Sequence, residues 1–380
     1  MSLRKISITV FLFSAVVGLA ACGGGGGGGN SGGPTSGSSS SSTSSGSSSS
    51  SGGYAKADLA LDFSVLIRSG YADLDTRFTE LATATTTFCG DTSSEENFDA
   101  LKTSWQNAMQ AWQYMQGINF GPIDEDTRRY RIAFYPLDQA QLDTRILDLI
   151  NGTDEISQEL VAGSAVSLQG LVALERIYFK TDALMFINVP SDTARYCALV
   201  SAITSNLTSI SAPVLDAWQS GGSYALPFTN SANVETSLED WFGSVVEHLQ
   251  IIEDTKLRSA GGMNEGDIES PLAQSSLLNI DNNIAFIEAA FRIENDAGIE
   301  AILNAANATA VATELQARLN ILRIALDARS GTLVELRGSD AGVTELEAIA
   351  DAVHQVLEYM AVEVAEALDV FIGFNGADGD

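Results

Sequence analysis

Apolar residues recur every three or four positions along most of the chain after residue 54, which is the spacing of one face of an α-helix. The segment 345–368 shows this pattern, and so does the segment 101–118. Alternation with a period of two, which would indicate strands, is absent over any useful length. The pattern predicts an all-α protein. The apolar face of 101–118 consists of Leu101, Trp105, Ala108, Trp112 and Met115.

The helical pattern is interrupted by short segments rich in Gly, Asp, Asn and Ser, which are typical of turns. Pro213 should kink or break the helix that contains it. Helices with short connections pack as antiparallel neighbours, so we expect two packed antiparallel helical bundles with a polar pocket between them, in halves of about 54–190 and 191–380. The predicted helices are 54–88, 101–118, 138–150, 155–180, 192–220, 235–258, 274–296, 300–332 and 345–368.

The first 21 residues have the pattern of a bacterial export signal. Two basic residues precede the apolar run 6–19, which is too short for an ordinary membrane span. The run ends in LAAC, which resembles a lipobox, and the resemblance implies cleavage before Cys22 and acylation of its thiol. Gly23 follows where an Asp would favour the inner membrane, so we expect an outer-membrane lipoprotein facing the periplasm or the surface. The alternative is a plain secretory signal with a chance cysteine.

Residues 22–53 are almost entirely Gly and Ser after the cysteine. Such a segment has too little apolar surface to offset the entropy lost on ordering, so it predicts a flexible tether. The folded part is therefore expected to span 54–380.

The net charge bears on the possible partners of the protein, and the cysteine content bears on its disulfide bonding. The formal net charge is −29, which disfavours nucleic acid as a partner because phosphate backbones are bound mainly by Lys and Arg. Strong acidity favours solubility and can attract cations. Of the three cysteines, Cys22 is assigned to lipid. In an exported protein the other two, Cys89 and Cys197, are predicted to form a disulfide.

One carboxylate stands out within an apolar helix. In QGLVALERIYF, residues 169–179, Glu175 lies among Leu, Ile and aromatic residues. A buried carboxylate is costly unless a partner compensates for the lost hydration, so Glu175 is a candidate site residue.

Five segments, in order along the chain, resemble imelysin-like proteins. The resemblance covers about 60–380, and it implies an all-helical fold. The family includes insulin-cleaving metalloproteinases, iron-regulated envelope lipoproteins and periplasmic components of iron uptake. The five segments are SWQNAMQAWQYMQGINFGPIDEDTRRYRIAFYP, QGLVALERIYF, ARYCALVSAITSNL, IESPLAQSSLLNIDNNI and GFNGADGD.

The signature of that family is Gly-x-His-x-x-Glu, and this chain matches it in part. Gly170 and Glu175 are present, but Val172 occupies the position of the histidine. A His and a Glu three residues apart share one helix face and can bind zinc or iron. Valine has no donor atom. The resemblance thus leaves zinc or iron possible as a cofactor, with Glu175 as a weak metal ligand.

Glu175 then has three interpretations. It pairs with a buried arginine, for which Arg129 is the chosen partner; it binds a cation or small solute; or it acts as a catalytic base, which needs a positioned partner or metal. The two histidines, His248 and His354, are expected on solvated helix faces, although either could approach Glu175 in the fold.

Two further segments matched by the resemblance contain polar side chains. Ser275 and Ser276 lie in a serine-containing segment of the family, and a helix N-cap is the alternative role. The C-terminal GFNGADGD resembles a cation-binding loop only faintly, and its match to the family terminus suggests that it folds onto the body. The sequence contains no His-Glu-x-x-His metalloprotease motif, no Gly-x-Ser-x-Gly, no Walker loop and no dinucleotide-binding fingerprint.

These observations favour a noncatalytic, imelysin-like envelope lipoprotein that binds a small ligand or cation, and the resemblance links it to iron uptake. The expected ligand-binding residues are Gly170, Val172, Glu175, Arg129 and Ser275, without a catalytic residue. One alternative is a metal-dependent peptidase of the same family with an unusual ligand set. Another is an interaction module that docks a second envelope protein.

Overall fold

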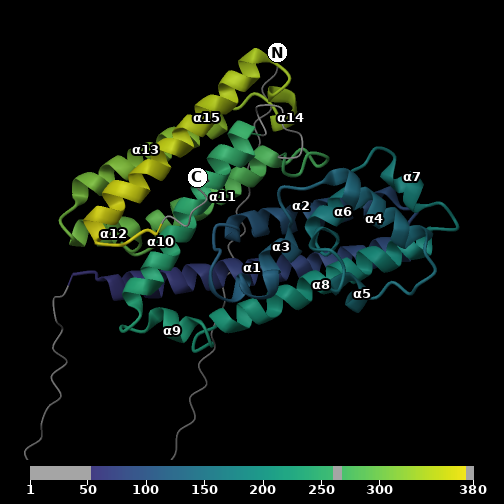
Figure 1. Ribbon diagram of the computed structural model, residues 1–380, viewed down its shortest axis with the longest axis horizontal. Coiled ribbons are helices and arrows are strands. Elements are labelled where there is room, and N and C mark those ends of the chain that lie inside the picture. The colour runs from purple at the N-terminus through teal and green to yellow at the C-terminus, as the bar shows by residue number, and fades with distance from the viewer. Residues whose placement is uncertain (1–52, 260–267, 374–380) are drawn as a thin grey trace, which may run out of the picture. The chain divides into compact units, whose positions relative to one another are not determined.

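The computed structural model describes residues 53–259 and 268–373, and these residues are helical apart from their connections (Figure 1). Within them no strand forms, and an isolated bridge joins Ile293 to Ala297. The prediction of an all-α protein is confirmed. The predicted signal peptide, Cys22, the tether up to residue 52 and the C-terminal 374–380 lie outside the described residues. The described residues form one compact unit by their internal contacts.

Long helices alternate with short ones along the chain. The α-helices of the first half are α1 (Lys56–Gly90), α2 (Glu95–Met115), α3 (Arg128–Ile132), α4 (Gln139–Asn151), α5 (Gln158–Ala162), α6 (Leu171–Tyr178) and α7 (Ala183–Ile187). Those that follow are α8 (Thr193–Trp218), α9 (Ala225–Thr229), α10 (Val234–Gln250), α11 (Ser276–Phe291), α12 (Ile299–Ala305), α13 (Thr309–Asp327), α14 (Leu333–Leu336), α15 (Asp340–Tyr359) and α16 (Ala365–Leu368). Between them lie the 3₁₀ turns η1 (Gly121–Ile123), η2 (Glu125–Thr127) and η3 (Val166–Leu168) and the π-helical segments η4 (Ile251–Ser259) and η6 (Met360–Val364).

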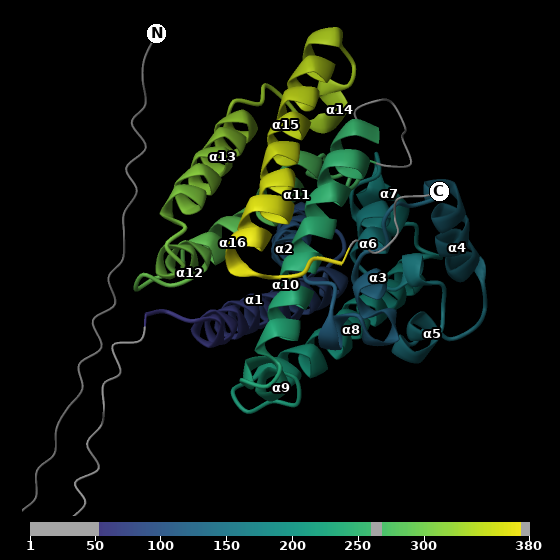
Figure 2. The ribbon, with the colours of Figure 1, turned by 60° about the vertical axis from the view of Figure 1, so that its left-hand side comes forward.

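Helix α1 packs lengthwise against α8 and α2, and two views show α1 beside α8 (Figure 1, Figure 2). Large aromatic side chains fill this part of the core; the rings of Phe63 and Trp241, for example, stack with centroids 3.9 Å apart. By length and composition α8 is apolar enough to cross a membrane, but more than half of its apolar window is buried inside the protein. Its apolar character is therefore that of a core helix.

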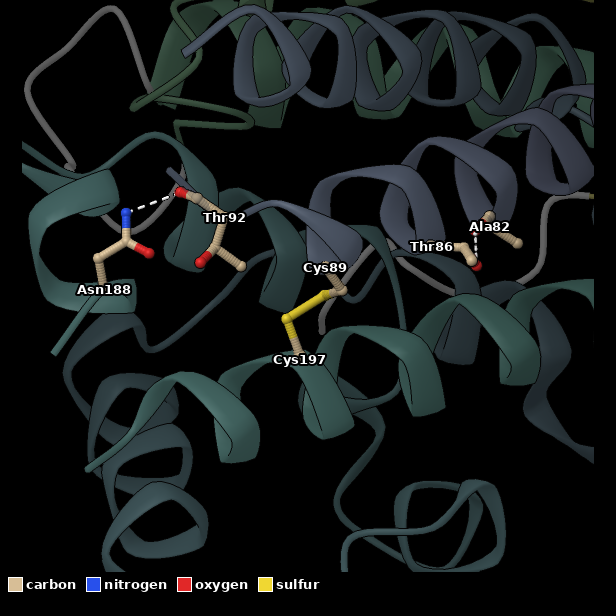
Figure 3. The surroundings of a disulfide bond; sticks show 6 residues. All are labelled: Ala82, Thr86, Cys89, Thr92, Asn188 and Cys197. Carbon is tan, nitrogen blue, oxygen red and sulfur yellow. Dashed lines mark hydrogen bonds between the residues drawn. A yellow bond between two sulfur atoms is a disulfide. The ribbon is translucent and has the colours of Figure 1, made fainter. Parts of the chain in front are cut away.

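A disulfide joins α1 to α8, as predicted. Cys89 near the end of α1 and Cys197 near the start of α8 are bonded, with their Cα atoms 5.7 Å apart (Figure 3). The bridge closes a loop across a sequence separation of 108 residues. Close by, the Asn188 side chain donates a hydrogen bond of 2.7 Å to the carbonyl of Thr92, which ties the loop before α2 to the end of α7.

Several predicted helices differ from the observed ones for local reasons. The segment 155–180 is divided into α5, η3 and α6, with glycines at positions 163 and 170, where helix propensity is low. The segment 300–332 is divided after α12, where Asn307 adopts a left-handed backbone that Asn tolerates. Conversely, α8 continues through Pro213 to its end, so the expected break there is wrong.

Helix ends carry the capping residues that the sequence offers. Ser94 accepts a hydrogen bond from the amide of Asn97 and starts α2 six residues before the predicted start. Asp138 caps α4 in the same way, and Ser339 caps α15. Each cap satisfies an amide that has no partner inside the helix, which fixes where these helices begin.

Candidate functional site

Gly170 is needed because α6 begins against the end of α3. A Cβ atom at position 170 would lie 2.1 Å from the carbonyl oxygen of Ile132 and 2.3 Å from that of Arg131. No side chain fits at such a distance from backbone atoms. The Arg131 guanidinium also donates to the side chain of Gln169 at 2.7 Å. The signature glycine thus allows a close helix contact and supplies no ligand group.

Val172 and Glu175 lie one turn apart on α6 but in different surroundings. Val172 is half-buried and packs against the hydrophobic core. Glu175 is 2% exposed, and its Oε1 accepts hydrogen bonds from the backbone amides of Leu272 and Ala273, each at 2.9 Å. The carboxylate therefore fixes the connection 268–275, which we call the 268–275 loop, to α6.

Arg129 is not the partner of Glu175, so that prediction is wrong. Its Nε lies 3.1 Å from Oδ1 of Asp124, its Nη2 donates to the hydroxyl of Tyr130 at 2.9 Å, and its guanidinium lies over the Tyr130 ring. Glu175 pairs with two backbone amides and not with the expected arginine, because the loop places both amides within hydrogen-bonding distance of one carboxylate oxygen. Sequence periodicity carries no information about such a contact.

Burial dominates the electrostatics of Glu175. Loss of hydration raises its pKa to about 7, although the hydrogen bonds from Ala273 and Leu272 act in the opposite direction. Such a pKa is typical of groups that transfer protons. In this protein, however, the carboxylate accepts hydrogen bonds from loop amides, and Glu175 does not line the cavity around Arg129 that is described below.

The 268–275 loop is held at a second point by a buried ion pair. Lys256 on η4 is 2% exposed, and its Nζ lies 2.8 Å from Oε2 of Glu269. Burial lowers the pKa of Lys256, whereas the adjacent carboxylate raises it. Burial alone would raise the pKa of Glu269, but the Lys256 ammonium and hydrogen bonds from amide side chains hold it below its usual value. The two partners thus offset part of each other's cost of burial.

Amide side chains complete the shell around this pair. Lys256 Nζ donates to the side-chain oxygens of Gln113 at 2.9 Å, Gln116 at 2.6 Å and Asn283 at 3.0 Å. Gln113 also donates to Glu269 at 2.9 Å. A buried ion pair is tolerated only when its remaining hydrogen-bonding groups are satisfied in this way. The network joins α2, η4, the loop and α11.

A cavity of about 120 Å³ lies beside this network, between α2, α3 with the segment after it, and α10. We call it the Arg129 cavity. Gln116 belongs both to its lining and to the shell of Lys256. The lining consists of Trp112, Gln116, Asn119, Arg129, Tyr130, Ala133, Tyr135, Glu247, His248 and Ile251.

Three buried nitrogen atoms of the cavity lining have no hydrogen-bond partner within the protein. One is Nε of Arg129, which forms an ion pair with Asp124. The other two are Nε1 of Trp112, which is 1% exposed, and Nε2 of His248, which is 5% exposed. Buried polar groups are almost always paired, so unpaired ones beside a cavity indicate a place for a ligand. The arginine guanidinium beside them adds a positive charge.

The two histidines differ from each other. His248 is buried, so the prediction of a solvated face is wrong for it, and burial lowers its pKa well below the usual value, with Lys256 and Arg129 adding to the effect. His354 is 44% exposed, as expected, and its Nδ1 lies 2.9 Å from Oε2 of Glu253. A hydrogen bond with that carboxylate raises the pKa of His354. Among the described residues, Glu175 takes its hydrogen bonds from the two loop amides and from neither histidine.

Ser275 occupies the N-cap position of α11, but its side chain makes no capping hydrogen bond and its Oγ is buried without a partner. Of the predicted ligand-binding residues, Gly170, Val172 and Glu175 lie on or beside α6, and Ser275 ends the loop that Glu175 holds. Of the predicted ligand-binding residues, only Arg129 lines the Arg129 cavity. The predicted residues are thus divided between the loop anchor and the cavity.

Sequence reasoning missed the residues of the buried network. Asn279 and Asn283 interrupt the apolar face of α11 one turn apart, and both are almost fully buried. Paired polar residues on an apolar face are a signal that could have located the network. Lys256 offered no such signal, because it lies in a polar run, DTKLR.

The described residues do not suit a resident zinc or iron ion. No group of three or more His, Cys, Asp or Glu side chains comes together among them. At the signature, Val172 has no atom that could bind a metal, and Oε1 of Glu175 already accepts hydrogen bonds from two backbone amides. Tight transition-metal sites need three or more protein ligands.

The all-helical fold and the degenerate signature on α6 define the class of protein to which this chain belongs. The Imelysin family model matches residues 67–360, and the chain is a member of the imelysin family. No curated protein matches the sequence.

Two solved structures share the fold. One is an imelysin-like protein from Psychrobacter arcticum 273-4, with a TM-score of 0.70 and 20% identity, over 84% of this chain and 98% of that one. The other is a putative iron-regulated protein A precursor from Parabacteroides distasonis ATCC 8503, with a TM-score of 0.65 and 14% identity, over 84% and 97%.

Proposed function

We propose that the protein is a noncatalytic envelope lipoprotein that binds a small polar solute in the Arg129 cavity. The observation that carries this proposal is the pair of unpartnered, buried atoms in the cavity lining, Trp112 Nε1 and His248 Nε2, beside the guanidinium of Arg129. A ligand that hydrogen-bonds to both atoms would remove the cost of leaving them unpaired.

The cavity also fits the proposed two-bundle architecture. Its lining comes from α2, α3 and the segment after α3 on one side and from α10 with η4 on the other. We propose that these belong to two bundles with the polar pocket between them. In this proposal α8, although it follows residue 190, belongs to the first bundle, because it packs mainly on α1.

The noncatalytic part of the proposal rests on α6. Hydrolysis by a zinc peptidase needs a held metal that lowers the pKa of bound water. In this chain Val172 cannot bind a metal, so the His–Glu ligand pair is incomplete. Glu175 accepts hydrogen bonds from two backbone amides and so is not free to act as a catalytic base. A metal-dependent peptidase is therefore the less supported alternative, and an interaction module has no specific contact in its favour.

The envelope location rests on the sequence LAAC before position 23, which resembles a lipobox. Replacement of Cys22 by Ser should move the protein from the membrane to the soluble fraction of exported proteins. Retention in the membrane would contradict the lipid anchor. A link to iron follows only from the family resemblance, and a rise of the protein on iron depletion would support it.

The binding function is tested by thermal melting of the full-length protein, extracted from envelopes in detergent, against a panel of small anionic, cationic, zwitterionic and neutral metabolites. We expect at least one solute to raise the melting temperature. Arg129→Met should abolish the rise, whereas Arg318→Met, which removes an ion pair with Glu314 on the surface of α13 and lies outside the Arg129 cavity, should leave it intact. Absence of any Arg129-dependent shift would contradict the proposal.

A further inference from the structure

A larger and strongly acidic groove adjoins the Arg129 cavity. It has a volume of about 480 Å³ and lies between α10, the segment around η1 and residues 371–373. We call it the acidic groove. Asn119 and Glu247 line both spaces, and the Asn119 side chain donates a hydrogen bond of 2.8 Å to Glu247 Oε2. The two spaces are therefore neighbours that share one hydrogen-bonded wall.

The charges of the groove are only partly balanced. Asp124 lies beside Arg129, and Glu247 accepts from Asn119. Glu239 and Asp240 form no ion pair with any described residue. Burial raises the pKa of Asp240, and the neighbouring Glu239 raises it further. The outer space thus favours a cationic group.

The inner cavity has the opposite and complementary set of groups. Burial lowers the pKa of His248 well below its usual value, so the imidazole is neutral and one of its two nitrogens is an acceptor. Nε2 has no hydrogen-bond partner within the protein, and we assign the acceptor to that atom. Trp112 Nε1 can only donate, and Arg129 is a cation. The cavity therefore offers an acceptor together with a donor and a positive charge.

An acceptor next to a donor and a guanidinium is the pattern that an ammonium and a carboxylate on one carbon atom require. The ammonium would donate to His248 Nε2 and to Glu247, and the carboxylate would accept from Arg129 and Trp112. A zwitterionic head group also adds no net charge to the small inner cavity, which limits the desolvation cost. A simple anion would leave the acceptor atom of His248 without a hydrogen bond. A simple cation would be repelled by the positive charge of Arg129.

We propose that the ligand is a free basic amino acid, with its α-amino and α-carboxyl groups in the Arg129 cavity and its cationic side chain in the acidic groove towards Glu239 and Asp240. This inference rests on the proposed function, since it names the ligand class of the same cavity. The shared wall at Asn119 and Glu247 is where the side chain would pass from the inner to the outer space.

The test is calorimetric titration of the full-length protein with four probes. L-Arginine carries all three groups, agmatine lacks the carboxylate, N-acetyl-arginine lacks the ammonium, and norvaline lacks the cationic side chain. We expect L-arginine to bind and each of the other three to bind at least about tenfold more weakly, which is the effect of about 1.4 kcal/mol.

Variants assign the groups to their places. Arg129→Met should remove the difference between L-arginine and agmatine. The pair Glu239→Gln with Asp240→Asn should weaken L-arginine but leave norvaline unchanged. Glu347→Gln, an exposed carboxylate on α15, is the matched control and should bind like the natural protein.

The outcomes separate the two proposals. Binding of norvaline or agmatine as tightly as L-arginine would overturn the basic amino acid. So would the absence of L-arginine binding in a protein that shows an Arg129-dependent thermal shift with another solute, and in that case the proposed function would stand. If no solute gives an Arg129-dependent shift, both proposals fail.

Discussion

Oε1 of Glu175 lies 2.9 Å from the backbone nitrogen of Ala273, 98 residues further along the chain. The signature glutamate of the family segment therefore acts in this protein as an anchor for the 268–275 loop. The same loop carries Glu269, whose partner Lys256 contacts Gln116 in the wall of the Arg129 cavity. The loop thus links the anchor on α6 to the polar network beside the cavity.

Loss of this anchor should destabilise the protein. Glu175→Ala removes the acceptor of two backbone amides, those of the half-buried residues Leu272 and Ala273. An unsatisfied group costs about 1–3 kcal/mol when it is fully buried, and we expect a loss towards the lower end of that range for each amide. Glu175→Gln keeps a carbonyl oxygen for them, so its loss at pH 7 should be smaller. Chemical denaturation of both variants measures the difference in the free energy of unfolding. Equal stability of Glu175→Ala and the natural protein would contradict the anchoring role.

Glu175 should also make stability depend on pH. Its folded pKa of about 7 lies above the reference value of 4.5, so the folded state binds the proton more tightly than the unfolded state. Its contribution to stability is therefore full below pH 4.5 and is lost as pH rises through about 7, by an amount on the order of 3 kcal/mol. The difference in unfolding free energy between Glu175→Gln and the natural protein, measured from about pH 4 to 8, should follow this course. A pH-independent difference would show that the pKa is not raised.

Restoring the family histidine should not restore a metal site. Val172→His places an imidazole on the same face of α6 as Glu175, but the inner oxygen of that carboxylate is bound by Leu272 and Ala273. Two ligands, one of them engaged, fall short of a tight zinc site. Metal analysis after dialysis should find no stoichiometric zinc in either protein. Zinc bound by Val172→His and lost again with Glu175→Ala would contradict this expectation.

The Lys256–Glu269 pair should behave as a unit. Lys256→Met leaves a buried carboxylate without its cation, which costs about 3–5 kcal/mol. Glu269→Gln in the same background should recover part of that loss, because it removes the uncompensated charge. A double-mutant cycle on the free energy of unfolding measures the coupling. Simple additivity of the two single losses would show that the groups do not interact.

The disulfide can be tested by mass and by stability. Exported protein digested without reductant should yield a peptide pair that links Cys89 to Cys197. Closing a loop of this length contributes about 4–5 kcal/mol in the chain-entropy model, so the variant with Ser at both positions should lose stability of that order. Free thiols at both positions in exported protein would refute the bond.

Sequence periodicity located the long helices and, with the cysteine count, the disulfide, because both depend on regular spacing or on a small number of possibilities. It did not find where the segment 155–180 divides, since that depends on the approach of α3 to Gly170. Nor did it find the partners of Glu175 or the burial of His248. These arise from contacts between segments far apart in sequence, which a local pattern does not encode.

Native mass spectrometry of the full-length protein, purified from its own envelope, tests most directly whether the protein binds a solute in the Arg129 cavity without a metal centre. We predict a population that carries one small organic solute and no transition metal, and Arg129→Met should lack the solute. A stoichiometric zinc or iron ion that persists in Arg129→Met and disappears in Glu175→Ala would contradict the noncatalytic, solute-binding role, because it would place a metal centre at the family signature.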